Sequence, residues 1–225
     1  MPKNTPRISV IVGHYGTGKS EMAVSLAMKR KSEGKKVALG DLDIVNVYFR
    51  SREKAEVLEE KGIHVVSSTL GHRSGLDLPA ISSEIRNYFF DPDAQVILDV
   101  GGDKAGTNAL VMFRQDVLSV GYEMIFTVNA YRPQTSDLAG LLYHLEGIEF
   151  VSRLTVTGLA VTTHQLRDTT VSDVMKGYDL AKQLSEKRGI PIRYVCALPH
   201  VLQELPEDLE GEQIPIGMYL REEWM

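Results

Sequence analysis

The chain has 225 residues, is 43% hydrophobic and carries a formal net charge of −5, so it can bury roughly 70% of the surface that its unfolded form exposes. Its 25 lysines and arginines form no long basic run, which argues against a nucleic-acid partner. The single cysteine, Cys196, excludes an intramolecular disulfide and any zinc or iron–sulfur site held by paired cysteines, and its apolar neighbours predict a buried thiol.

Seven continuous apolar runs, rich in β-branched residues, predict strands buried on both faces: 7–12, 36–41, 63–68, 95–100, 124–129, 154–162 and 192–198. Segments of helical period lie between most of them, at 19–33, 51–61, 79–90, 107–119, 134–146 and 170–188. This alternation predicts an α/β fold: a doubly wound, mostly parallel sheet of about seven strands with helices on both faces. Because no internal repeat or linker interrupts the pattern, we expect one domain over residues 1–225.

The first predicted strand leads directly into the sequence Gly13-His14-Tyr15-Gly16-Thr17-Gly18-Lys19-Ser20, which fits the pattern GxxxxGK[ST]. Glycines let the backbone wrap a phosphate with its N–H groups, and the following helix start adds a positive dipole end. Lys19 would bridge the β- and γ-phosphates, and the Ser20 hydroxyl would be a magnesium ligand. The alternative dinucleotide pattern GxGxxG fails because its third glycine position holds Glu21.

Carboxylates at the ends of two other predicted strands complete this site. Asp99 ends the fourth strand as the expected Walker B residue, and Asp99 to Gly102 also reads DxxG, so the Gly102 N–H could sense a γ-phosphate. Asp41 and Asp43 follow the second strand on one face, because side chains alternate with period two. One of this pair can meet the metal shell while the other orients the attacking water. We therefore assign Ser20, Asp41 and Asp99 to the metal, and Lys19, Asp41 and Asp43 to catalysis.

Together these motifs resemble the SIMIBI class of P-loop NTPases, and within it the MinD/ParA/CobQ/CobB nucleotide-binding group. The resemblance implies a parallel sheet of seven or eight strands, ATP with Mg²⁺, slow hydrolysis and often a homodimer with nucleotide near its interface. The chain departs from the group at one point: the signature KGGxGK[ST] has a lysine and a glycine where this sequence has His14 and Tyr15. A histidine is a shorter and mostly neutral substitute for that lysine.

The sequence predicts ATP rather than GTP, because the loops after the late strands lack the N-K-x-D or T-K-x-D pattern of GTP-specific relatives. Asn129 stands where the resembled group commonly places polar contacts to adenine, with Thr163 or His164 as a second candidate. Two longer loops, 43–53 and 68–79, follow strands that should end at the ligand edge of the sheet. The first holds Arg50 and Arg52 beside aromatic residues, and the second holds His72 and Arg73 between glycines.

Three functions remain open at this level. The leading hypothesis is an ATPase switch, in which the loops 43–53 and 99–108 report hydrolysis to an unknown protein partner. The second is an ATP-dependent kinase or amidoligase-type transferase, favoured by His72, Arg73 and the segment 129–137. The third is a nucleotide-dependent helper in metal-centre assembly, for which the sequence offers little. We expect a cytoplasmic protein without membrane association, since residues 1–7 lack a signal-peptide core and no stretch reaches roughly 18 apolar residues.

Overall fold

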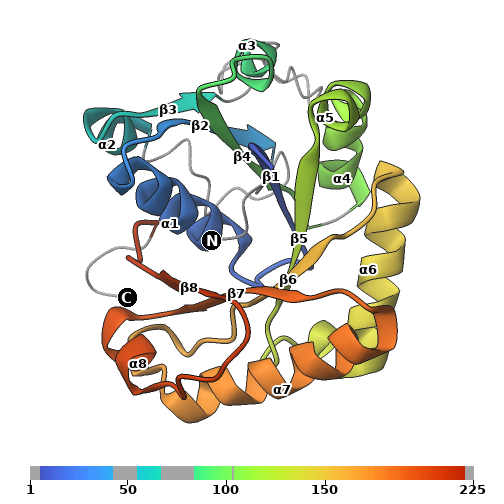
Figure 1. Cartoon of the computed structure of the whole chain (residues 1–225). Coiled ribbons are helices and arrows are strands. Elements are labelled where there is room, and N and C mark those ends of the chain that lie inside the picture. Colours follow the sequence, from blue (N-terminus) through green and yellow to red (C-terminus); the bar gives the residue numbers. More distant parts are fainter. Residues whose placement is uncertain (1–5, 43–54, 67–83, 103, 221–225) are drawn as a thin grey trace, which may run out of the picture.

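The computed structural model describes residues 6–42, 55–66, 84–102 and 104–220. Its centre is a single sheet in which all eight described strands run parallel (Figure 1). In chain order the strands are β1 (Ile8–Val12), β2 (Lys36–Leu42), β3 (Ile63–Val66), β4 (Ala94–Val100), β5 (Tyr122–Val128), β6 (Gly158–Val161), β7 (Ile192–Ala197) and β8 (Glu212–Pro215). Their order in the sheet is β3-β2-β4-β1-β5-β6-β7-β8, which places β1 between β4 and β5.

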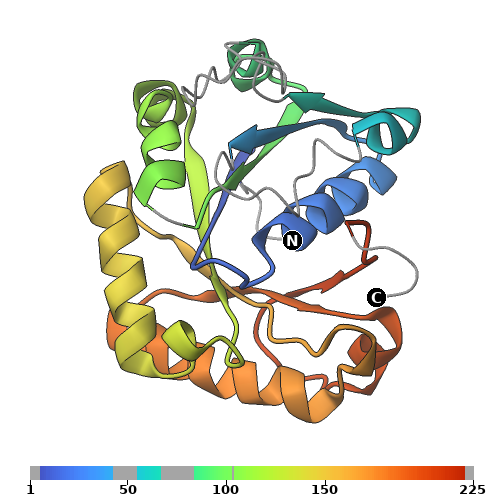
Figure 2. The same ribbon diagram turned by 180° about the vertical axis from the view of Figure 1, so that it is seen from behind.

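Helices cover both faces of this sheet, as the two opposite views show (Figures 1 and 2). One apolar cluster lies beneath α1 (Lys19–Ser32) and α2 (Ala55–Glu60). The larger cluster lies on the other face, beneath the remaining helices: α3 (Ile85–Phe89), α4 (Lys104–Val111), α5 (Arg114–Val120), α6 (Leu138–Ser152), α7 (Val171–Arg188) and α8 (Pro199–Glu204). The central strand shows why both faces are apolar: Val10 packs into the larger cluster, while its neighbour Ile11 packs into the cluster under α1.

The expected fold class is confirmed, with local differences. The sequence does not predict β8, a strand with the short and partly polar sequence Glu-Gln-Ile-Pro that pairs with β7 at the sheet edge. The single helix expected over 107–119 is two helices, because the chain turns at Phe113, whose buried ring packs edge-to-face on Phe89. The helix expected at 134 instead begins at Leu138, where the Asp137 carboxylate caps it by accepting from Gly140 N at 2.8 Å.

Among the described residues, no helix combines the length and the apolar character that crossing a bilayer requires. All described strands end at the same edge of the sheet, since they are parallel. The loops that follow β1, β4, β5, β6 and β7 therefore gather at that edge, which in open α/β sheets is the usual place for a ligand.

Candidate functional site

The loop after β1 adopts a conformation that its glycines make possible. Gly16 and Gly18 have φ angles of +73° and +91°, in the left-handed region that side chains disfavour. Gly13 lies so close to β5 that a Cβ there would stand 2.2 Å from Thr127 Oγ1. Thr17 is fully buried and fastens the loop, because its hydroxyl lies 2.6 Å from Thr127 Oγ1 and donates to His14 O at 2.7 Å. The loop is thus held in a fixed shape directly before α1 begins at Lys19.

Lys19 and Ser20 open α1 and are both largely buried. The Lys19 ammonium donates to His14 O at 3.2 Å, so it folds back across the loop. A loop of backbone N–H groups, a helix N-terminus and one ammonium together form an environment suited to an anion.

Asp41 and Asp99 lie side by side on neighbouring strands. They are direct partners in the register of β2 and β4, and Asp99 also pairs with Ile11 near the end of β1. Both carboxylates are buried, with 4% and 0% of the residue exposed. Within the described parts of the chain, no three His, Cys, Asp or Glu side chains form a metal-binding group. Two carboxylates and the Ser20 hydroxyl nevertheless offer the oxygen donors that Mg²⁺ prefers, and this ion usually completes its shell with water and substrate phosphates.

Gly102, in the loop after β4, touches the loop between β1 and α1, residues 13–18, which we call the phosphate loop. A Cβ on this residue would lie 2.6 Å from Tyr15 N and 2.9 Å from Lys19 Nζ. Only a glycine fits such a close approach of two backbones. The DxxG segment and the lysine of the GxxxxGK[ST] motif are therefore in direct contact.

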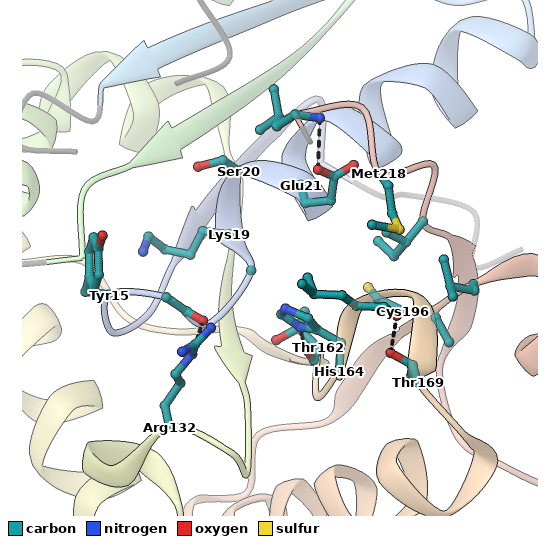
Figure 3. Close-up of a pocket in the computed structure, with 17 residues that line it drawn as sticks. Tyr15, Lys19, Ser20, Glu21, Arg132, Thr162, His164, Thr169, Cys196 and Met218 are labelled. Carbon is teal, nitrogen blue, oxygen red and sulfur yellow. Dashed lines mark hydrogen bonds between the residues drawn. The ribbon is translucent and has the colours of Figure 1, made fainter. Parts of the chain in front are cut away.

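A cavity of about 280 Å³ extends from the phosphate loop toward β7 and β8 (Figure 3). Tyr15, Gly16, Gly18, Lys19 and Ser20 border it at one end. Its other walls are mostly apolar and come from the loop after β6, from the end of β7 and from the segment after β8. Apolar walls with a few polar groups are typical of small-molecule sites, and the volume lies just below their usual range of roughly 300–1,000 Å³.

Backbone strain marks two of these walls. Leu166 and Met218 have φ angles of +56° and +51°, and both line the cavity. Bulky residues rarely adopt such angles, and strain of this kind persists chiefly at ligand sites.

Several wall residues are absent from the sequence-based site. Arg132, after β5, lines the cavity and donates from Nε to Gly16 O at 2.6 Å. Cys196 and Leu198 come from β7 and the residue after its end, and Ile216 follows β8. Cys196 is buried as expected, and this burial raises the pKa of its thiol. The apolar wall carries no local motif, so only its position at the ligand edge of the sheet could have pointed to it.

The side chain of Asn129, the residue predicted to contact adenine, has two neighbours in the structure. This residue is buried; its Oδ1 accepts from Tyr131 N at 3.0 Å, and its Nδ2 lies 3.4 Å from Nδ1 of His164, a residue that lines the cavity. Thr163, one of the two second candidates, is likewise buried and donates to the backbone of β5, whereas the other, His164, does line the cavity. The base contact stays a prediction, and of its three candidates His164 is the one that lines the cavity.

His14 and Tyr15 point in different directions. Tyr15 is exposed and borders the cavity. The His14 ring packs on His144 of α6, with 4.2 Å between ring centroids. Burial lowers the pKa of His14, and the neighbouring His144 and Lys19 lower it further; burial also lowers the pKa of His144. The histidine at the position of the signature lysine thus has a partner within its own chain.

The remaining predicted residues, Asp43 and the loops 43–53 and 68–79 with His72 and Arg73, lie outside the described residues.

No family model matches the sequence, and no curated protein matches it. Solved structures do. The cell division protein FtsY from Thermotoga maritima has a TM-score of 0.54 and 22% identity over 87% of this chain and 63% of that chain. Chloroplast FtsY from Physcomitrella patens has a TM-score of 0.57 and 21% identity over 86% and 59%. The signal recognition particle 54 kDa protein from Aeropyrum pernix, solved in complex with GDP, has a TM-score of 0.54 and 21% identity over 87% and 42%.

These likenesses show a shared fold, and the chain spans less than two thirds of the FtsY and signal recognition particle chains. With its parallel sheet and its glycine loop between β1 and α1, this fold is that of the P-loop NTPases.

Proposed function

We propose that this chain is a SIMIBI-class nucleotide-binding protein that binds ATP with Mg²⁺ and hydrolyses it slowly as a switch. One observation carries the proposal: the glycine loop that Lys19 folds across borders an apolar cavity and follows β1, whose Ile11 is the register partner of Asp99, itself paired with Asp41. The triphosphate would lie in the loop, and the nucleoside would lie in the cavity. The likeness to FtsY and the 54 kDa protein supports the class, while membership in the MinD/ParA/CobQ/CobB group stays a prediction from the motifs.

Ser20, Asp99 and Asp41 would hold Mg²⁺, directly or through water. When bound, the ion would offset negative charge on the β- and γ-phosphates. Lys19 would add one positive charge to the same oxygens. Asp41 and Asp43 are the predicted residues for orienting the attacking water, and the contact of Gly102 with Lys19 gives the loop after β4 a route to sense the γ-phosphate.

ATP is the proposed nucleotide because the guanine pattern is absent from the sequence. The cavity agrees with this choice: among the described residues that line it, Glu21 is the one carboxylate, and its oxygens accept from the backbone N–H groups of Tyr219 and Leu220. A carboxylate held in this way is not presented to the N–H groups of guanine. Because the Aeropyrum structure contains GDP, the base preference has to be measured on this chain.

The test is a calorimetric titration of Mg-ATP and Mg-GTP into the wild type and Lys19→Ala. Lys35→Ala is the control, since it removes an equal charge from an exposed turn. We expect tighter binding of ATP than of GTP, a loss of about 100-fold in affinity for Lys19→Ala, and no change for Lys35→Ala. Equal binding of ATP by the wild type and Lys19→Ala would refute the assignment.

A phosphoryl transferase is the second candidate, and Arg132 is the observation that favours it. Its guanidinium lies at the cavity wall beside Gly16, where it could contact a second anionic substrate as well as the nucleotide. Phosphate release with ATP, alone and with a panel of carboxylate metabolites, separates the two functions. A rate that no metabolite changes favours the switch.

A nucleotide-dependent homodimer also stays a prediction. The packing of His14 on His144 argues against a role for His14 in a partner's phosphate site. Sedimentation with and without ATP tests this point, and an ATP-dependent dimer that survives His14→Ala would show that residue 14 is not part of the interface chemistry.

A further inference from the structure

The segment after β8, residues 216–220, is fastened to α1 by one side chain. Glu21 lies in the first turn of α1. Its Oε1 accepts from Tyr219 N at 2.5 Å, and its Oε2 accepts from Leu220 N at 3.1 Å. Hydrogen bonds with an ionised acceptor are roughly twice as strong as neutral ones. Glu21, which occupies the third glycine position of the GxGxxG pattern, thus binds the backbone of residues 219 and 220.

Two further bonds hold the same segment. Ile216 N donates to Ala197 O at 2.8 Å, which extends the pairing of β8 with β7. Gly217 N donates to Ser25 Oγ at 3.5 Å, and Ser25 lies one helical turn after Glu21 on α1. The segment therefore bridges the sheet edge and the helix that begins at the phosphate loop.

Alternate residues of the segment face the cavity. Ile216, Met218 and Leu220 line it, together with residues of the loop after β6. Met218 has the positive φ angle that bulky residues rarely adopt. Because the two bonds to Glu21 follow directly at residues 219 and 220, they oppose the release of this unfavourable backbone angle.

We propose that Glu21 is a positioning residue that holds the segment 216–220 as one wall of the nucleoside part of the cavity, and thereby sets affinity for the nucleoside rather than for the phosphates. This inference rests on the proposed function, in which the triphosphate occupies the loop and the nucleoside the apolar end. Glu21 acts through the segment and takes no part in the reaction.

The experiment compares Glu21→Ala and Glu21→Gln with a matched control, Glu33→Gln, at the other end of α1. Glu33 is exposed and pairs with Arg30, away from the cavity. Two ligands are titrated against each full-length protein with Mg²⁺ present: ATP and inorganic tripolyphosphate, which has the phosphates without the nucleoside. We expect Glu21→Ala to lose about tenfold in affinity for ATP and to keep its affinity for tripolyphosphate within about twofold. Glu21→Gln, which keeps one acceptor oxygen, should lose less, and Glu33→Gln should lose nothing.

A loss of general stability would weaken both ligands alike, so the ratio of the two affinities separates positioning from folding. A parallel loss for ATP and tripolyphosphate, or no loss for either, would overturn the proposal. If the wild type binds neither ligand, the proposed function fails, whatever Glu21 does.

A second measurement needs no ligand. The Tyr219 and Leu220 amides should exchange with deuterium at least about tenfold faster in Glu21→Ala than in the wild type or Glu33→Gln, because their acceptor is gone. Unchanged protection of these two amides would overturn the tether on which the inference depends.

Discussion

Replacing Gly102 by alanine tests the contact between the loop after β4 and the phosphate loop. The added methyl group would lie 2.6 Å from Tyr15 N, 2.9 Å from Lys19 Nζ and 3.0 Å from the His14 carbonyl carbon. Ordinary contact begins near 3.4 Å, so 3.4 Å minus 2.6 Å leaves 0.8 Å by which one backbone must move. Tyr15 N belongs to the phosphate loop itself, so the displacement falls on the atoms proposed to hold the triphosphate.

The magnitude follows from this overlap. Overpacking of this kind costs about 1–3 kcal/mol, and for a chain of this size each kcal/mol lowers Tm by about 2–4 °C. If about 1.4 kcal/mol of the cost acts on the bound state, the Kd for Mg-ATP rises about tenfold. The backbone N–H of residue 102 is retained in the variant, so the expected loss is steric.

The assay is calorimetric titration with Mg-ATP together with thermal denaturation, with Gly147→Ala as the control. Gly147 lies within α6, and a Cβ there would meet no atom within 4 Å. The control should gain about 0.5–1 kcal/mol from better helix propensity and should bind ATP like the wild type. If Gly102→Ala also keeps the wild-type Kd and Tm, the loop after β4 does not pack on the phosphate loop, and the reasoning is wrong.

Three further predictions concern other buried or partly buried groups. Glu123 is buried near the start of β5, away from the strand ends that carry the phosphate loop, and its Oε1 accepts from Ser9 Oγ at 2.6 Å and from Tyr194 OH at 2.8 Å. Glu123→Ala should lower the free energy of unfolding by about 2–4 kcal/mol in urea denaturation and leave ATP affinity unchanged. Burial raises the pKa of the Cys196 thiol, so a disulfide reagent at pH 8 should react slowly with the folded protein and rapidly in guanidinium; equal rates would contradict its burial. The pKa values of His14 and His144 are lowered in the folded protein, so the unfolded chain takes up protons first as the pH falls below about 6.5. The free energy of unfolding should therefore decrease from pH 7 to pH 5, and His144→Gln should reduce that decrease. A free energy of unfolding that does not change with pH would refute this prediction.

The sequence and the tertiary structure contributed different parts of the candidate site. The loop 13–20 could be recognised from sequence because its requirements are local: glycines where φ is positive, then a lysine and a serine at a helix start. Asp99 could be placed because an apolar strand ends there, and the register of β2 with β4 brings Asp41 beside it as parallel strand ends should. The alternation of strands and helices was enough to predict the doubly wound sheet.

Asn129 shows where local reasoning ends. A polar residue at a strand end can face a ligand or satisfy the turn that follows, and the sequence does not distinguish these uses. In the structure, Asn129 accepts from Tyr131 N in that turn and also lies 3.4 Å from the His164 ring at the cavity wall, so both uses stay open. Similarly, β8 has too weak a pattern to be predicted alone, and it exists because β7 offers an edge for pairing.

The sequence by itself pointed to the proposed phosphate end, because residues 13–20 are one continuous segment, a glycine loop followed by the start of α1. Only the tertiary structure decided the rest of the cavity. Its walls come from segments that no short pattern connects, and the bond between Glu21 and Leu220 spans 199 residues. Contacts over such separations arise from the packing of the whole sheet, so the proposed nucleoside end of the cavity could be described only from the folded chain.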